Sequence, residues 1–112
     1  REQAAGQLAQ ARAHLDRLLA HEAAQELREP ARYLRCRLEL DAHRDADALA
    51  CLDAFRRDFP ASPHDAAVLA LLIGLYQLRA DCPRALPLLD EYLRRYPGGP
   101  LDARARRTRC AR

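Results

Sequence analysis

The sequence contains one stretch twice, as ALACLDAFRRDFPASP at residues 48–63 and as ALPLLDEYLRRYPGGP at residues 85–100. A shift of 37 residues aligns two pairs of prolines and two pairs of aromatic residues between these stretches. The same shift places Leu34 on Leu71, and the match weakens toward the N-terminus. Because self-similarity at a fixed period is typical of repeat architectures, we expect a chain built from similar units.

The composition favours helices. Val68, Ile73 and Thr108 are the only β-branched residues, so strands would lack the side chains that pack well on a pleated surface. Alanine, leucine, arginine and glutamate, which are good helix formers, dominate the chain. The sequence therefore predicts an all-α fold.

Length and charge exclude several classes of protein. The 112 residues are enough for a single domain, 1–112, and too few for a large multi-domain enzyme. With 49% hydrophobic and 31% charged residues, the chain is too apolar for disorder and too charged for a membrane protein. The longest apolar run, residues 66–76, covers about half of a bilayer, so we expect no transmembrane segment.

Apolar spacing and proline positions predict about five to six helices, at about residues 2–28, 31–42, 66–79, 83–96 and 101–109, with a third helix between the second and the fourth whose buried face runs from Leu49 to Phe59. Pro30 is expected to end the first helix and to start the second. Asp45 or Asp47 is expected to cap the third helix, and Asp65 to start the fourth. Pro87 fits only near the first turn of a helix, which predicts a late start or a slight bend in the fifth.

The repeated unit has a physical interpretation as a helix hairpin that cannot cover its own apolar face and stacks on its neighbours. The recurrent alanine, Ala48 or Ala85, lets two helices approach closely, and the aromatic residue seven positions later fills the gap. The expected buried face of the third helix consists of Leu49, Leu52, Phe55 and Phe59.

This pattern resembles the tetratricopeptide repeat (TPR). The small, large and proline positions of that family are matched by Ala66, Leu69, Leu72, Tyr76, Ala85, Leu89, Tyr92 and Pro97. The resemblance implies a short right-handed α-solenoid of antiparallel hairpins, divided into an N-terminal helix (1–28), a divergent repeat (29–60), the best repeat (61–97) and a terminal helix (98–112). The divergent repeat carries Arg32, Arg35 and Glu39 where apolar or aromatic residues are usual, and Ile73 stands where the family has glycine, beside Gly74.

The period and the proline-rich turns narrow the resemblance. The period of 37 residues exceeds the usual TPR period of about 34. Together with the phrases FPASP and YPGGP at residues 59–63 and 96–100, it is similar to a bacterial cell-envelope subgroup of the Tol-Pal coordinator and outer-membrane-assembly lipoprotein type. That resemblance implies a periplasmic or envelope-associated protein; a cytoplasmic location is the alternative.

The four cysteines, Cys36, Cys51, Cys82 and Cys110, have no C-x-x-C spacing, so a zinc ribbon or a thioredoxin-like motif is not supported. A hairpin that turns near residues 44–45 brings Cys36 and Cys51 opposite each other. Cys82 and Cys110 lie at one end of the next antiparallel pair, offset by about a turn. Disulfides in an oxidising periplasm and four small buried thiols both remain open.

The TPR resemblance implies a concave groove for a peptide, lined by the first helix of each unit. The groove positions are Tyr33, Arg37 and Leu40, then Ala70, Gly74 and Gln77, then Arg104, Arg107 and Thr108. Small residues at 70 and 74, flanked by Arg37 and Arg107, predict an acidic or amphipathic peptide segment. The alternative for Gly74 is that it only allows helix packing. The chain has no asparagine, which some family members use to clamp a C-terminal carboxylate.

Catalysis, metal binding and nucleic-acid binding have weaker support. Ser62, His64 and Asp65 are sequence neighbours, which is typical of a capping loop rather than of a catalytic triad. The segment 21–25 lacks the second histidine of a zinc-protease helix. The arginines of residues 104–112 can contact phosphates, but no aromatic residues interleave with them. We therefore expect no enzyme, cofactor or metal, and a non-catalytic protein-protein interaction module; the alternatives are a spacer or homo-oligomerisation segment of a larger protein and an arginine-mediated nucleic-acid regulator.

Overall fold

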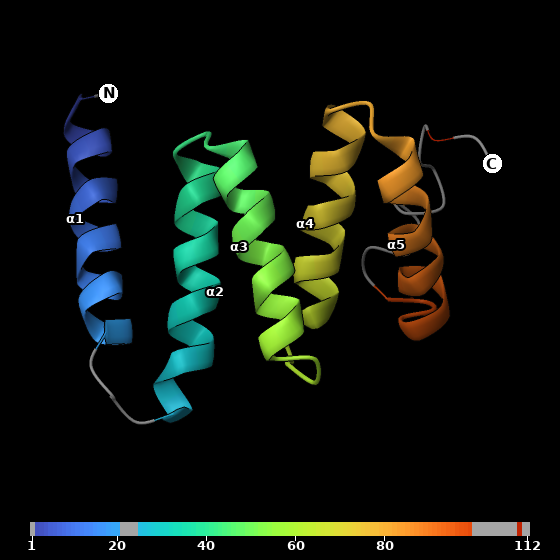
Figure 1. The fold of residues 1–112 in the computed structure, drawn as a ribbon, viewed down its shortest axis with the longest axis horizontal. Coiled ribbons are helices and arrows are strands. Elements are labelled where there is room, and N and C mark those ends of the chain that lie inside the picture. The colour runs from blue at the N-terminus through green and yellow to red at the C-terminus, as the bar shows by residue number, and fades with distance from the viewer. Residues whose placement is uncertain (1, 21–24, 100–109, 111–112) are drawn as a thin grey trace. The chain divides into compact units, whose positions relative to one another are not determined.

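The computed structural model describes residues 2–20, 25–99 and 110 of the chain. It contains the helices α1 (Glu2–Ala20), α2 (Gln25–Asp41), α3 (Asp45–Asp58), α4 (Asp65–Leu78) and α5 (Cys82–Arg95) (Figure 1). The described residues form no strand, so the predicted all-α fold is confirmed. The sixth predicted helix, 101–109, lies outside the described residues.

The chain divides into two compact units, residues 1–62 and residues 63–112, which we call the N-terminal and C-terminal units. In the N-terminal unit, α2 packs against both α1 and α3. In the C-terminal unit, α4 packs against α5. Among the described residues, the N-terminal unit thus contains the helix hairpin α2–α3, and the C-terminal unit contains the hairpin α4–α5.

The two hairpins have the same boundaries when the sequence is shifted by 37 residues. Helix α3 begins at Asp45 and ends at Asp58, and helix α5 begins at Cys82 and ends at Arg95. The preceding helices end at Asp41 and Leu78, which are separated by the same shift. The period found in the sequence is therefore also the period of the hairpin boundaries.

The turn between the helices is also the same in both hairpins. In the first, the Arg44 N–H donates to the Glu39 carbonyl at 2.9 Å, while His43 has a φ of 58°. In the second, the Asp81 N–H donates to the Tyr76 carbonyl at 2.8 Å, while Ala80 has a φ of 56°. This six-residue closure with a left-handed residue is the Schellman motif, which usually has glycine at that position. Both turns therefore hold a side chain in a strained backbone conformation.

The buried positions repeat as well. Ala48, Leu52 and Phe55 are buried in α3, and their counterparts Ala85, Leu89 and Tyr92 are buried in α5. Leu49 is buried as predicted, whereas Phe59 is only half-buried because it follows the end of α3. Complete burial of a side chain such as Leu52 or Phe55 contributes about 1.5–3 kcal/mol. The repeated stretch therefore contributes the same set of buried core positions to each unit.

The first helical prediction was wrong. Helix α1, Glu2–Ala20, packs side by side with α2, Gln25–Asp41, so residues 2–28 do not form one continuous straight helix. Pro30 does not end a helix, since it lies inside α2 as the sixth residue. A proline this close to the start of a helix removes one backbone hydrogen bond, and the later turns of the helix stay intact. Ala31 and Cys36, buried in those later turns, help to hold α2 in place.

The predicted helix starts also needed correction. Arg44 precedes α3 as its N-cap without a side-chain cap, and Asp45 and Asp47 lie in the first turn, where the helix dipole favours negative charge. Helix α5 does not start late, because the Asp81 side chain accepts a hydrogen bond from the Arg84 N–H and caps it. Pro87 therefore lies inside α5.

Candidate functional site

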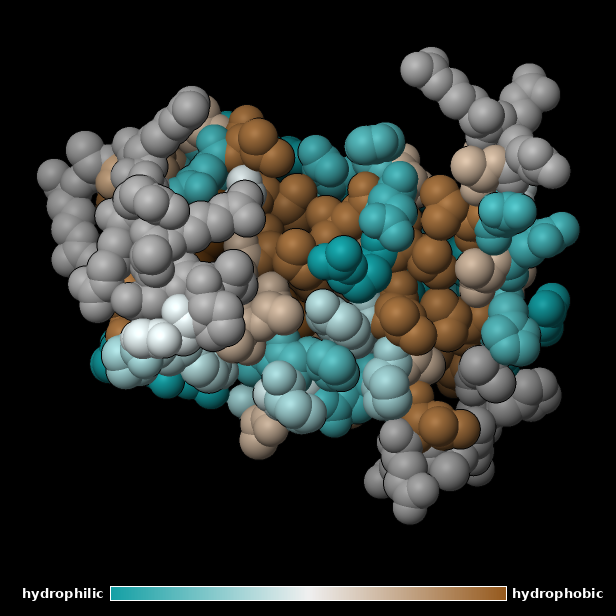
Figure 2. All heavy atoms as spheres, turned by 180° about the vertical axis from the view of Figure 1, so that it is seen from behind, coloured by the Kyte–Doolittle hydropathy of each residue, from teal (hydrophilic) through white to brown (hydrophobic). Residues whose placement is uncertain are grey.

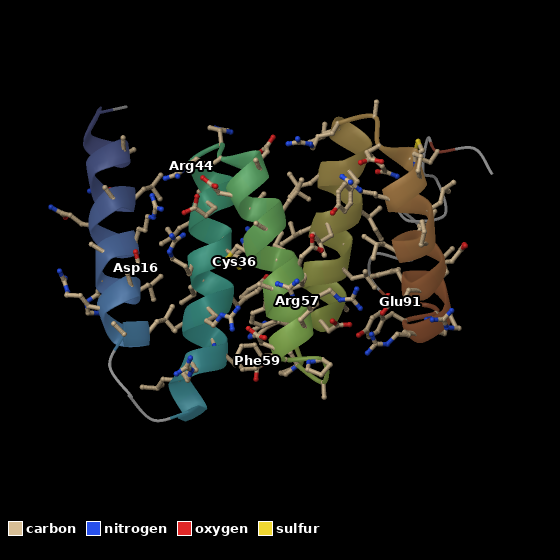
Figure 3. The ribbon with its side chains drawn as sticks, in the orientation of Figure 1. Asp16, Cys36, Arg44, Arg57, Phe59 and Glu91 are labelled. Atoms are coloured by element: carbon tan, nitrogen blue, oxygen red, sulfur yellow. A yellow bond between two sulfur atoms is a disulfide. The ribbon has the colours of Figure 1, made fainter. Side chains whose placement is uncertain are left out.

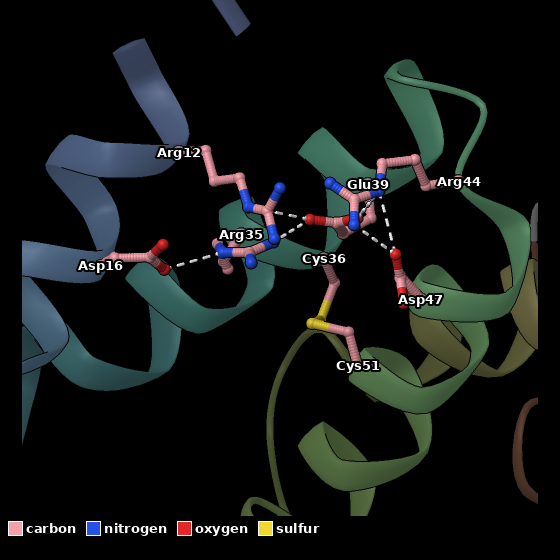
Figure 4. Close-up of polar contacts among 8 residues, drawn as sticks. All are labelled: Arg12, Asp16, Arg35, Cys36, Glu39, Arg44, Asp47 and Cys51. Atoms are coloured by element: carbon pink, nitrogen blue, oxygen red, sulfur yellow. Dashed lines mark hydrogen bonds and ion pairs between the residues drawn. A yellow bond between two sulfur atoms is a disulfide. The ribbon is translucent and has the colours of Figure 1, made fainter. Parts of the chain in front are cut away.

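A buried carboxylate lies in the contact between α1 and α2. Glu39 is only 3% exposed, and three arginines surround it (Figure 4). Arg12 of α1 approaches Glu39 Oε1 at 3.3 Å through Nε, and Arg35, one turn earlier on α2, donates to the same oxygen. Arg44, in the turn after α2, has its Nε 3.2 Å from Oε2. A buried charge of this kind is stable only when it is paired.

Two further carboxylates pair with two of these arginines, in addition to Glu39. Asp16 of α1 accepts a hydrogen bond of 2.8 Å from Arg35 Nε, and Figure 3 shows Asp16 on the side of α1 that faces α2. Asp47 accepts a hydrogen bond of 2.9 Å from Arg44 Nε and lies 2.6 Å from its Nη2. We call these six residues, Arg12, Asp16, Arg35, Glu39, Arg44 and Asp47, the Glu39 cluster. Its three positive and three negative side chains balance.

The Glu39 cluster shifts the pKa of Arg35. Burial, the largest single influence, acts to lower this pKa, but the hydrogen bonds and charges of Asp16 and Glu39 together outweigh it and raise the pKa above its ordinary value. These two carboxylates therefore favour the charged form of Arg35.

One oxygen of Glu39 is not satisfied within the cluster. Glu39 Oε2 is buried and accepts no hydrogen bond from the described residues. Arg44 approaches this oxygen, but its Nε–H is directed to Asp47. A buried acceptor without a donor costs about 1–3 kcal/mol, and more when it is charged. This oxygen therefore has capacity for one more donor.

Three residues of the Glu39 cluster, Arg12, Glu39 and Arg44, form the polar end of an open groove of about 690 Å³ between α1 and α2. The exposed residues Asp41 and His43 also line the groove. Figure 2 shows hydrophobic surface over the α1–α2 part of the chain. The apolar wall of the groove consists of Ala4, Ala5, Leu8, Ala9, Leu38 and Ala42.

The groove positions predicted from the sequence lie elsewhere on α2 and on α4. On α2, Arg37 is exposed, and Tyr33 and Leu40 are half-buried. The Tyr33 ring contacts the Phe55 ring, with 6.0 Å between their centroids. We call Tyr33, Arg37 and Leu40 the α2 face. These three residues lie four and three positions apart, so they share one side of the helix.

On α4, the predicted positions Ala70, Gly74 and Gln77 are all half-buried. Ala70 packs against the core cluster formed by Leu69, Ile73, Leu89 and Tyr92. A Cβ added at Gly74 would meet no atom within 4 Å, so close packing does not require this glycine. The remaining positions, Arg104, Arg107 and Thr108, lie outside the described residues.

Sequence reasoning missed the Glu39 cluster, although a signal was present. Arg35 and Glu39 correspond, after the shift of 37 residues, to Leu72 and Tyr76, which are buried in α4. The divergent hairpin thus carries charges where the other hairpin carries apolar side chains. The structure shows the reason: this side of α2 packs against Arg12 and Asp16 of α1.

Asp65 makes a buried polar contact in the described part of the C-terminal unit. Asp65, at the start of α4, accepts a hydrogen bond of 2.6 Å from the Tyr96 hydroxyl and lies 3.0 Å from Arg95 Nη1. Arg95 also lies over the Tyr96 ring, 5.3 Å from its centroid. These contacts connect the start of α4 to the end of α5. Asp65 therefore has a structural role here, and Ser62, its neighbour in the proposed capping loop, donates instead to Glu29.

Disulfides join Cys36 to Cys51 and Cys82 to Cys110, each with 5.4 Å between the Cα atoms. The first disulfide connects α2 to α3, and the second connects the first residue of α5 to residue 110. Each lies within one unit. No described cysteine is a free thiol.

Searches for other site types gave no candidate within residues 2–20, 25–99 and 110. No described helix is long and apolar enough to cross a membrane. No three described histidine, cysteine, aspartate or glutamate side chains gather as metal ligands; the segment 21–24 is not described. Comparison with protein-family models, with curated proteins and with solved structures found no match.

Proposed function

We propose that the chain is a non-catalytic protein-protein interaction module of the TPR-like type, in which repeated hairpins present the face of their first helix to a peptide. The observation that carries this proposal is the repetition of the whole hairpin. Helix ends, turn hydrogen bonds and buried positions recur with a period of 37 residues. Repeat units of this kind commonly serve as binding scaffolds because stacked units build an extended surface.

The α2 face has the chemistry of a peptide-binding surface. Tyr33 offers an aromatic surface whose ring is held by Phe55, and Arg37 offers an exposed cation one turn later. Aromatic and arginine side chains are the commonest anchors of binding energy at interfaces. The partner that fits this pair is an acidic or amphipathic segment, which places a carboxylate on Arg37 and an apolar side chain on Tyr33.

We also infer that the protein works in a periplasmic or envelope-associated setting. The two disulfides support this location, because structural disulfides persist in oxidising compartments and are rare where thiols are kept reduced. A cytoplasmic protein would hold Cys36 and Cys51 as thiols. Trapping free thiols with an alkylating reagent at the moment of cell lysis separates the two locations: labelled cysteines would contradict the proposal.

The experiment that tests the binding function starts with affinity capture from the native source and identification of the partner segment. Its affinity is then measured by calorimetry for the wild type, Tyr33→Ala, Arg37→Ala and the control Arg57→Ala. Arg57 is an exposed arginine of α3 outside the α2 face (Figure 3). We expect each variant on the face to weaken binding about tenfold and Arg57→Ala to leave it unchanged. Equal binding by all four proteins would reject the α2 face.

A second function, oligomerisation within a larger assembly, is favoured by one observation. Leu27 and Leu34 of α2 are 58% and 53% exposed, and their spacing of seven residues places them on one side of the helix. Sedimentation of the wild type against the Leu27→Ser/Leu34→Ser variant tests this alternative. A wild type that is monomeric at all concentrations would count against oligomerisation. A wild-type oligomer together with a monomeric double variant would support it.

A further inference from the structure

We propose that the groove between α1 and α2 is a binding site for a primary carboxamide, the side chain of an asparagine or glutamine in a peptide segment of a partner protein. The site uses none of the residues of the α2 face. It consists of Glu39 and Arg12 at the polar end of the groove and of the small apolar side chains beside them.

The first step of the argument is the unsatisfied acceptor. Glu39 lines the groove, and its buried Oε2 accepts no hydrogen bond from the described part of the chain. Arg44 covers this oxygen, but Asp47 holds the Arg44 guanidinium at 2.6–2.9 Å, closer than the 3.2 Å to Glu39. Arg44 can therefore move away and keep its partner. An N–H group from the groove would then complete the hydrogen bonding of Glu39.

The second step is a donor beside that acceptor. Arg12 is 38% exposed and, among described residues, contacts Glu39 only through Nε. Its two terminal nitrogens remain to donate to a group in the groove. Figure 4 shows Glu39 between the guanidinium groups of Arg12 and Arg44. The end of the groove thus offers one acceptor and adjacent donors, the complement of the N–H and C=O of a single amide.

The third step is charge. The three arginines of the Glu39 cluster balance its three carboxylates. A cation in the groove would meet the field of three guanidinium groups, and an anion would approach a buried carboxylate. A neutral, dipolar amide avoids both costs and has the lowest desolvation penalty of the three. Asp41 and His43 also line the groove, but both are exposed, so solvent screens their interactions with a bound group.

The fourth step is size. A volume of about 690 Å³ is within the range of ligand pockets and far exceeds one carboxamide. The alanines at 4, 5 and 9 leave room on the α1 wall for neighbouring apolar side chains of the same segment. The occupant that fills both parts is therefore a peptide with a glutamine or asparagine next to small apolar residues, rather than a free amide.

The test uses ¹⁵N-labelled protein and three peptides, N-acetyl-Ala-Gln-Ala methylamide and its counterparts with glutamate or lysine in the centre. The backbone amides of Ala9, Leu38 and Ala42 report on the groove. We expect the glutamine peptide to shift these resonances and to bind at least about tenfold more tightly than the other two. Equal or tighter binding of the glutamate or lysine peptide would overturn the proposal, as would no groove shift with the glutamine peptide.

Two variants make the assignment specific. Arg12→Met removes the donor from an accessible position and leaves Glu39 paired with Arg35. It should weaken the glutamine peptide about fivefold or more, whereas Arg57→Met, an exposed position of the same unit outside both the groove and the α2 face, should not. Unchanged affinity in Arg12→Met would overturn the site. Butyramide, the free amide, should bind more weakly than the peptide; the reverse would reject a peptide occupant.

A second copy of the chain is the remaining occupant. Gln7 and Gln10 on α1 are exposed and would be its source of carboxamides. Groove shifts that grow with protein concentration in the absence of peptide would show self-association and overturn the partner assignment. The outcome is independent of the α2 face, because none of its three residues lines the groove.

Discussion

At the scale of residues, the dominant feature is a buried negative charge, the carboxylate of Glu39. Glu39 is paired with arginines from α1, from its own helix and from the following turn. Burying an ion pair gives little net stability compared with apolar packing, whereas removing one partner leaves uncompensated charge. The Glu39 cluster therefore selects the position of α1 on α2 more than it stabilises the fold.

Replacing Glu39 should be far more damaging than replacing an ordinary surface acid. Glu39→Ala leaves three arginines around an empty centre, and we expect a loss of about 3 kcal/mol in the free energy of unfolding. Glu91→Ala, which removes a partner of Arg95 on the surface of α5, should cost less than about 1 kcal/mol. Urea unfolding of both variants measures the difference. Similar urea midpoints for the two variants would show that Glu39 is not essential to the contact between α1 and α2.

Asp58 should make the stability depend on acid. The hydrogen bond from Arg32, followed by its charge, lowers the pKa of Asp58 below the ordinary value of 3.8. Because the folded pKa is depressed, the stabilising contribution is fully present above pH 3.8 and is lost as the pH falls through the folded value. Comparing urea midpoints of wild type and Asp58→Asn should show a gap above pH 4 that closes in stronger acid. A gap that stays constant with pH would refute this.

At the scale of elements, the turn of each hairpin stores strain in a known place. Ala80 adopts a left-handed φ of 56°, where a Cβ costs about 1 kcal/mol relative to glycine. Ala80→Gly should therefore raise the free energy of unfolding by about 0.5–1 kcal/mol. The control Ala50→Gly, at an exposed position inside α3, should lower it by about 1 kcal/mol. Thermal unfolding followed by circular dichroism tests whether the two glycines act in opposite directions.

The disulfide between α2 and α3 should be a major contribution to the stability of the N-terminal unit. Its sequence separation of 15 residues predicts about 3 kcal/mol from the restricted unfolded chain. Cys36→Ala/Cys51→Ala should lose this amount in urea under oxidising conditions. Thiol counting of the denatured, unreduced protein should find none of the four cysteines free. Four reactive thiols would contradict the disulfides in both units.

The helix ends that could be predicted are those followed by a proline in both repeats. Pro60 and Pro97 allowed the ends of α3 and α5 to be placed within one residue. The division of residues 2–28 between α1 and α2 could not be found in this way, because Pro30 lies within a helix and residues 7–29 contain no glycine or proline. Propensity alone does not distinguish one long helix from two when alanine, leucine and glutamate continue across the junction.

At the scale of the whole molecule, the sequence predicted repeated hairpins but not the charged groove. Arg32, Arg35 and Glu39 were recognisable as departures from the repeat. Their role depends on the register of α1 against α2, which brings Asp16 to Arg35 and Arg12 to Glu39. Such a register is set by tertiary packing and leaves no periodic signal. The divergent hairpin is thus where the proposed carboxamide site arose.

The two disulfides have a mechanical consequence. If an oxidised chain is stretched from its ends, tension passes through the sulfur bridges and leaves residues 37–50 and 83–109 slack. At about 3.3–3.6 Å per residue, the exclusion of these two loops from the stretched path shortens the fully extended chain by about 140 Å. A single-molecule pulling trace would gain that length when reductant is added. The length that the fully stretched chain can reach therefore depends on whether its disulfides are oxidised or reduced.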